Sequence, residues 1–139
     1  MPLRRALQLL TITALLSGCM APAPDCEATG GGQPMLVAEL LFGRNQGGKL
    51  RVTDADWQVF VAEELTTRFP DGLTVVDALG QWQDSGSRSL IREPSKLVLI
   101  AVTPGPETDA KLAEAIAAYK QRFAQQSVGL IRRQACVAF

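Results

Sequence analysis

The side chains available for chemistry are mainly carboxylates and guanidinium groups, because the 139-residue chain contains three cysteines and no histidine. Without histidine, the common pairing of a nucleophile with an imidazole base is excluded. Asp54 and Asp56 could suggest a cation site, but the helix dipole also favours carboxylates in a first helical turn, and no calcium-loop spacing is present. We therefore expect no metal and no cofactor, and we expect any catalysis to depend on carboxylates.

Seven side chains are candidates for binding: Glu39, Arg44, Asp77, Trp82, Arg92, Glu93 and Arg132. Glu39 interrupts an apolar segment, and the fold predicted below places Arg132 beside it on one face of a sheet. In one interpretation these two residues orient a polar group of a bound molecule, with Trp82 or Asp77 at the rim of the pocket. In the other, they form a cross-strand ion pair within an apolar surface.

Arg44, Arg92 and Glu93 lie on predicted loops near the ends of strands. Loops at such positions often carry binding residues. The alternative is that Arg92 and Glu93 only pair with each other.

The segment GRNQGGK at residues 43–49 matches the first seven positions of a phosphate-binding loop. The eighth position is Leu50, so the hydroxyl that would hold Mg²⁺ is missing, and the following helix is predicted to begin several residues later. We interpret this segment as a glycine-rich connection.

Residues 1–18 are typical of a processing signal, with two arginines before an apolar stretch from Ala6 to Leu16. That stretch is shorter than the roughly 20 residues that a membrane-spanning helix needs. It ends in Leu16-Ser17-Gly18-Cys19, which resembles the lipobox of bacterial lipoproteins and implies cleavage before an acylated Cys19. Several acyl chains suffice for a stable anchor. An ordinary secretory leader or a buried helix is the alternative.

Met20 follows the expected cleavage site and resembles the pattern that sorts lipoproteins to the outer membrane. We therefore expect a lipid-anchored protein of the bacterial cell envelope, on the outer membrane and facing the periplasm. Residues 19–34 combine prolines with a glycine run and show no apolar period, which predicts a lipidated flexible tether.

Two further thiols belong to Cys26, in the predicted tether, and Cys136, near the end of the last predicted strand. An exported protein meets an oxidising compartment, which favours a disulfide between them. The alternatives are a buried free Cys136 with an idle Cys26, or a catalytic thiol. A catalytic thiol would lack the histidine that commonly generates a thiolate.

Hydrophobic periodicity predicts one domain over residues 35–139. The first helix is expected to begin with a capping box between Thr53 and Asp56 and to end at Pro70. Pro94 cannot donate to a strand ladder, so it should mark a bulge or the point where pairing lapses. The predicted strands cover 35–43, 73–82, 88–92 continuing over 95–103, and 128–139, and the predicted helices cover 53–69 and 107–126.

The order strand, helix, strand, strand, helix, strand predicts an α+β fold. Right-handed crossovers of the two strand-helix-strand units lead to a ferredoxin-like βαββαβ sandwich. Its four-stranded antiparallel sheet has the order 4-1-3-2, and both helices lie on one face. A different strand order with the same elements is the closest competitor.

Both faces of the predicted sheet are largely apolar. In the segments 35–43 and 95–103, apolar residues occupy both sets of alternating positions. The helices can cover only one face, so the open face should meet something else that is apolar. A second copy of the chain, a ligand and another envelope protein are the candidates.

Four segments carry a family resemblance: ELLFGR at 39–44, FPDGLTV at 69–75, GQW at 80–82 and REPSK at 92–96. They resemble a family of small exported bacterial proteins known as a domain of unknown function. The likeness covers about Met35 to Phe139 and implies kinship without a specific activity.

The fourteen basic residues balance the fourteen acidic ones, so no net field favours a nucleic acid partner. The favoured hypothesis is a non-catalytic binding or assembly module of the cell envelope, which pairs with itself or with another envelope protein through the open sheet face. The alternative is a small enzyme resembling the dimeric α+β barrel folds, with Glu39 or Asp77 as acid or base.

Overall fold

Four strands form one antiparallel sheet in the computed structural model, which describes residues 23–28 and 30–139. The predicted leader and Cys19 therefore lie outside the described residues. The strands lie side by side in the order β4-β5-β1-β6. Because β4 and β5 are the second and third strands of the sheet along the chain, this is the predicted order 4-1-3-2. The α+β ferredoxin-like fold is confirmed. The bounds are β1 (Gln33–Gly43), β4 (Thr74–Gln83), β5 (Leu90–Val102) and β6 (Gly129–Val137).

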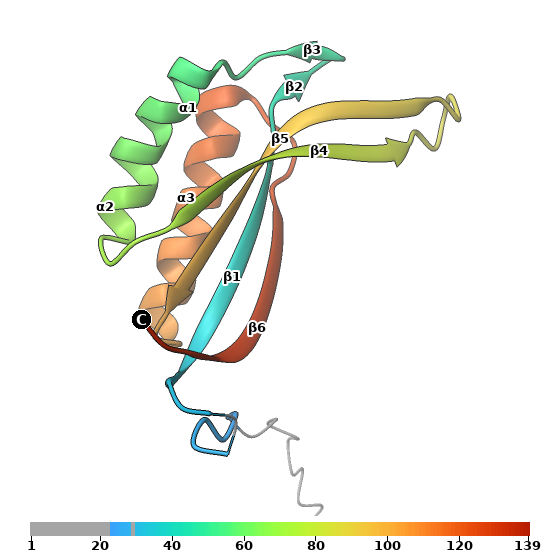
Figure 1. The fold of residues 1–139 in the computed structure, drawn as a ribbon. Coiled ribbons are helices and arrows are strands. Elements are labelled where there is room, and N and C mark those ends of the chain that lie inside the picture. The colour runs from blue at the N-terminus through green and yellow to red at the C-terminus, as the bar shows by residue number, and fades with distance from the viewer. Residues whose placement is uncertain (1–22, 29) are drawn as a thin grey trace, which may run out of the picture.

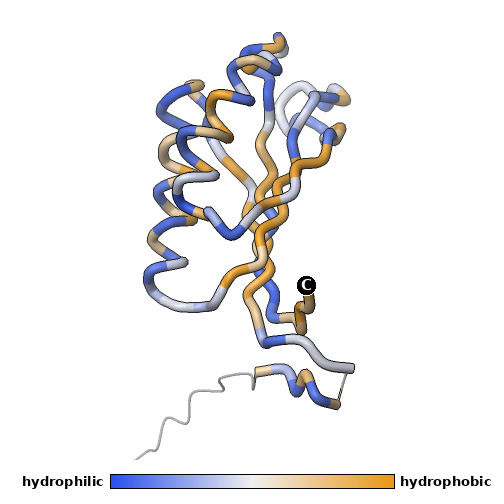
Figure 2. Tube along the Cα trace, turned by 60° about the vertical axis from the view of Figure 1, so that its left-hand side comes forward, coloured by the Kyte–Doolittle hydropathy of each residue, from blue (hydrophilic) through white to orange (hydrophobic). Residues whose placement is uncertain are grey.

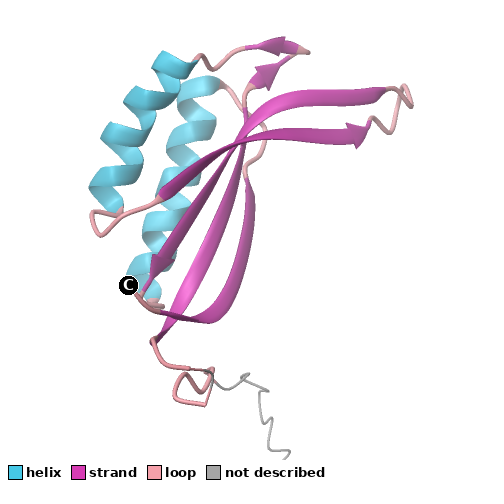
Figure 3. Cartoon of the chain, viewed as in Figure 1, coloured by secondary structure: helices cyan, strands magenta, loops and turns pink. Residues whose placement is uncertain are grey.

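Two helical segments cover one face of this sheet (Figure 1, Figure 3). The first begins as α1 (Asp54–Phe60), passes through the π-helical η1 (Val61–Leu65) and ends as α2 (Thr66–Arg68). The second is α3 (Pro106–Phe123). Within the described part of the chain, neither is long and apolar enough to cross a membrane.

The ends of the helices follow from local chemistry. The Thr53 hydroxyl accepts from the Asp56 N–H at 3.1 Å, and the Asp56 carboxylate accepts from the Thr53 N–H at 3.0 Å, so the predicted capping box is confirmed. Gly72, at φ +127°, allows the turn after α2. The predicted second helix ends three residues early, because Ala124 adopts a left-handed conformation at φ 52°.

The core lies between the helices and the side chains of β1 that face them. Leu36, Ala38, Leu40 and Phe42 alternate along β1 and are buried. The Phe42 ring lies 4.7 Å from that of Tyr119, between ring centroids, and the two rings meet edge to face. Figure 2 shows the hydrophobic colour concentrated along the central strands.

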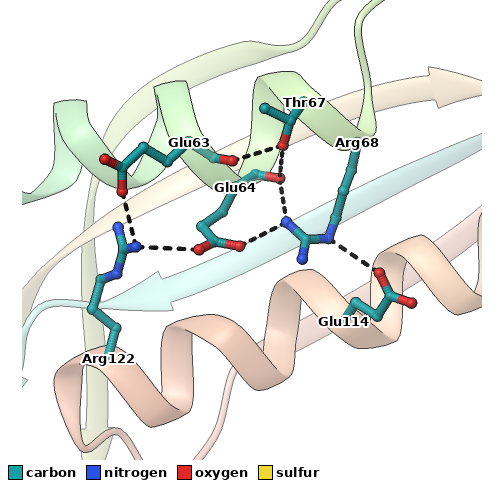
Figure 4. A network of polar contacts seen from close by, with 6 residues as sticks. All are labelled: Glu63, Glu64, Thr67, Arg68, Glu114 and Arg122. Carbon is teal, nitrogen blue, oxygen red and sulfur yellow. Dashed lines mark hydrogen bonds and ion pairs between the residues drawn. The ribbon is translucent and has the colours of Figure 1, made fainter.

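Ion pairs join the two helical segments (Figure 4). Arg122 Nη2 lies 2.9 Å from Glu63 Oε2 and 3.2 Å from Glu64 Oε1, and Arg68 Nε lies 3.4 Å from Glu114 Oε2. These side chains are partly exposed to solvent, so each pair is worth about 1 kcal/mol or less. The network orients the helices more than it stabilises them.

Strand β5 is continuous through Pro94, where an interruption was predicted. Pairing with β1 does end one residue away, at Gly43 opposite Ser95, but pairing with β4 continues through Leu79 opposite Pro94. The Pro94 carbonyl accepts from the Arg44 N–H at 3.1 Å, on the side of β5 that faces the end of β1. The nitrogen and the carbonyl of one strand residue point to the same side, so the Pro94 nitrogen also faces away from β4. The missing N–H therefore costs the β4 ladder nothing, and β4 and β5 run on as a two-stranded arm beyond the sheet (Figure 1).

The start of the described chain is bonded to the last strand. Cys26 and Cys136 form a disulfide, which confirms the predicted pairing. Cys26 is also 6 % exposed, and β1 begins at Gln33, two residues inside the segment predicted as tether. The disulfide thus attaches the chain that precedes the domain to the edge of the sheet.

Candidate functional site

The sheet face opposite the helices carries partly exposed apolar side chains, as predicted. Leu41, Val76 and Ile131 belong to three different strands of the sheet and are 41 %, 47 % and 47 % exposed. The helix-facing Leu40 and Val98 are fully buried by comparison. We call this surface the open face.

The ion pair on the open face involves Arg133, and the prediction that Arg132 lies there is wrong. Arg133 pairs with the carboxylate of Glu39. Arg132 lies opposite the buried Ala38 and pairs with Asp109 of α3, on the helix side of the sheet. A shift of one residue along a strand moves every side chain to the other face, and the polar sequence of β6 does not distinguish the two choices.

A pocket of about 620 Å³ lies where the open face meets the β4–β5 arm. Leu41, Gly43 and Ser95 belong to its sheet side, and Trp82 and Ile91 belong to the arm. The remaining walls come from the hairpin of β2 (Asn45–Gln46) and β3 (Lys49–Leu50) and from residues 124–127 after α3. Figure 1 shows these segments converging at the Gly43 end of β1.

Glu93 is the acidic residue of this pocket. It lies opposite Gly80 in the ladder, and its carboxylate occupies the space that a side chain at Gly43 would fill. Burial raises the pKa of Glu93, while a hydrogen bond from the Asn45 backbone N–H lowers it. None of the ion pairs within residues 23–28 and 30–139 includes Glu93. The acid therefore has no ion-pair partner among the described residues.

Trp82 lies on the same face of the arm as Glu93, because Trp82 pairs with Ile91 and Gly80 pairs with Glu93. Its side chain is 45 % exposed, so a flat aromatic surface is open to a ligand. Arg92 points to the opposite face, where its Nε donates to Gln81 Oε1 at 2.8 Å. The predicted alternative that Arg92 and Glu93 pair with each other is therefore wrong, since neighbouring strand residues face opposite ways.

Arg44 and Asp77 lie in a separate cluster on the helix side of the sheet. Arg44 is 7 % exposed, and its Nε donates to the Val52 carbonyl at 2.9 Å while its Nη2 lies 3.0 Å from Asp54 Oδ1. Lys96 pairs with both Asp54 and Asp77. The hydrogen bond with Asp77 raises the pKa of Lys96, and the hydrogen bond with Lys96 lowers the pKa of Asp54. This cluster secures the start of α1, and the prediction that Asp77 lies at the rim of the pocket with Glu39 is wrong.

Six uncharged polar residues of the pocket were not predicted: Asn45, Gln46, Ser95, Gln125, Gln126 and Ser127. Gln125 Nε2 donates to the Asn45 carbonyl at 3.0 Å, which fastens the β2–β3 hairpin to the end of α3. The glycines at 47 and 48 form the turn of this hairpin with φ +57° and +77°. The sequence features that could have indicated the pocket are Gly43 and Gly80, because both leave space beside the Glu93 side chain.

The pocket offers one half-buried carboxyl group, one aromatic ring, several amide and hydroxyl groups, and a set of apolar side chains. Such a site binds a small organic molecule through apolar contacts and uses a few polar groups for orientation. Catalysis at this place would depend on Glu93 as acid or base.

Glu93→Gln is expected to stabilise the ligand-free domain at neutral pH. Because the pKa of Glu93 is raised in the folded state, the ionised side chain costs stability as the pH rises from its ordinary value of 4.5 through the folded value. Thermal melts should show a higher Tm for the variant at pH 7 and no difference below the ordinary pKa. A lower Tm at pH 7 than for the wild type would contradict the burial of this acid.

The family described as "Protein of unknown function (DUF3574)" matches residues 37–139. A search of curated proteins finds no match. Among solved structures, a phage SAM lyase in complex with S-methyl-5'-thioadenosine is similar to this chain, with a TM-score of 0.58, 18 % identity and coverage of 77 % of this chain and 92 % of that chain. A phage SAM lyase in the apo state gives a TM-score of 0.55, 16 % identity and coverage of 76 % and 92 %. At these identities the likeness shows a shared fold.

Proposed function

We propose that this chain, which belongs to the DUF3574 family of proteins of unknown function, is a lipid-anchored protein of the bacterial cell envelope that binds a small organic molecule in the pocket of Glu93 and Trp82. The observation that carries this proposal is a half-buried carboxyl group beside an exposed indole ring in one cavity. Desolvation of the carboxyl group costs stability in the free protein, and the exposed indole ring is apolar surface that a ligand would cover.

The anchor and the pocket would lie at opposite ends of the domain. The chain enters β1 at Gln33, whereas the pocket surrounds Gly43 at the other end of this strand of 11 residues. Such a strand is roughly 35 Å long, at about 3.3 Å per residue. With lipid on Cys19, of the LSGC segment at 16–19, the pocket would face away from the outer membrane into the periplasm.

A screen of small soluble fragments by ¹⁵N NMR tests the proposed pocket, with S-methyl-5'-thioadenosine as one of the compounds. We expect the bound fragments to shift the indole N–H of Trp82 and to leave that of the buried Trp57 unchanged. Trp82→Ala should weaken their binding by about tenfold or more, because a buried aromatic contact is worth roughly 1–3 kcal/mol. Val76→Ala removes a similarly exposed open-face residue outside the pocket and should have no effect. Fragments that bind without shifting Trp82 would contradict the proposal.

A second candidate is an enzyme, since the structural neighbours are SAM lyases and Glu93 has the raised pKa that acid or base catalysis uses. This candidate predicts that the purified domain releases S-methyl-5'-thioadenosine from SAM and that Glu93→Gln abolishes the release. Binding without turnover would favour the non-catalytic module.

The rest of the open face fits a second copy of the chain. Outside the pocket it combines apolar side chains with the neighbouring charges of Glu39 and Arg133, so the same face of a second copy offers matching apolar area and both signs of charge. In sedimentation experiments the domain should form a dimer, and Ile131→Lys should give a folded monomer, because this side chain is exposed in one copy. A wild-type monomer at high concentration would contradict self-pairing.

A further inference from the structure

The pocket contains one buried acceptor that has no donor among the described residues, and a carboxylate without an ion-pair partner among them. Asn45 Oδ1 is buried and has no hydrogen-bond partner in the described chain. The carboxylate of Glu93 receives the Asn45 N–H and forms no ion pair with the described residues. Buried polar atoms are almost always satisfied, so the open acceptor at Asn45 indicates a ligand that supplies a donor, and the carboxylate of Glu93 is a further acceptor in the same pocket.

The charges of the pocket favour a cationic ligand over an anionic one. Among the described residues that line it, Arg92 alone is basic, and the hydrogen bond from Arg92 Nε to Gln81 Oε1 holds that side chain on the other face of the arm. An anionic ligand would therefore meet Glu93 with no cation to offset the repulsion. A cationic ligand would replace the water that Glu93 has lost and would form a charge-assisted hydrogen bond.

The apolar side chains of the lining indicate that the uncharged part of the ligand is apolar. Leu41, Leu90 and Ile91 line the cavity together with Trp82. An aromatic or aliphatic body can pack on these side chains, and a cation near the indole ring gains a further electrostatic attraction.

We propose that the pocket binds a primary ammonium compound, with the ammonium group held by Glu93 and Asn45 Oδ1 and an apolar body packed against Trp82. This inference rests on the proposed function, because it names the ligand class of the same pocket. It distinguishes primary ammonium compounds from neutral and anionic molecules of the same shape.

The test uses the matched probes phenethylammonium and 2-phenylethanol, titrated into the ¹⁵N-labelled mature protein. We expect phenethylammonium to shift the Trp82 indole N–H and to bind at least about tenfold more tightly than the alcohol, because charge-assisted hydrogen bonds are strong. Glu93→Gln should remove this preference, and Asn45→Ala should reduce it. Glu107→Gln is the control, since Glu107 lies on α3 outside the pocket lining and is paired with Lys111, and it should change nothing.

Equal affinities for the two probes, or an unchanged preference in Glu93→Gln, would overturn the cation inference and leave a pocket that binds apolar molecules. If neither probe nor any fragment shifts Trp82, the proposed function fails as well. Melting curves of each variant show whether it is folded.

Discussion

Replacing Cys19 with serine is expected to move the protein from the membrane fraction to the soluble periplasmic fraction. The LSGC segment at 16–19 is the proposed lipidation signal, and serine offers no thiol for acylation. Two or more acyl chains hold a protein stably at a membrane, at about 0.8 kcal/mol for each buried CH₂ group, so their loss should be decisive. The measurement is immunoblotting of separated fractions, with incorporation of labelled palmitate as a second readout.

Cys26→Ser is the matched control for this experiment. It removes a thiol seven positions further along the chain and should leave the lipid and the membrane association intact. A Cys19→Ser protein that remains in the membrane fraction and carries the label would contradict the proposed anchor.

Loss of the Cys26–Cys136 disulfide should lower the free energy of unfolding by about 2–4 kcal/mol. The bond closes a loop with a sequence separation of 110, so its removal greatly increases the freedom of the unfolded chain. Urea denaturation of the mature domain should show this loss in the double variant Cys26→Ser and Cys136→Ser.

A reducing agent provides the control, since it should destabilise the wild type by a similar amount and leave the double variant unchanged. If the reductant lowers the stability of both proteins equally, its effect does not come from this disulfide. Equal unfolding free energies for the oxidised wild type and the variant would contradict the predicted contribution.

Much of the fold is predictable from the sequence because local and long-range signals agree. The capping box at Thr53, the turn at Pro70 and the alternation along β1 each specify one local structure. Right-handed crossovers then leave few ways to pair the four strands, and the observed order is one of them.

The predicted site was less accurate, because it depended on which way single side chains point. In β1 and in the sheet part of β5, buried residues on the helix side identify the face, and Glu39 lies on the open face as predicted. The edge strand β6 has no such pattern, so Arg132 was assigned to the wrong face. A shift of one residue accounts for this error.

The pocket itself depends on tertiary structure that periodicity does not encode. Pro94 predicted an interruption, whereas β5 continues and carries Glu93 and Trp82's partner Ile91 beyond the sheet. The β2–β3 hairpin and the end of α3 then close the cavity from segments distant in sequence. Glu93 and Trp82 were both candidates for binding, but their proximity became evident only with the arm in place.

Intermolecular NOEs in an isotope-filtered NMR experiment on the mature protein test the pocket most directly, with phenethylammonium as the ligand. We expect NOEs from the ligand to the ring protons of Trp82 and to the side chains of Ile91 and Leu41, all of which line the cavity. NOEs confined to residues outside the cavity, such as Val76 and Ile131, would contradict it.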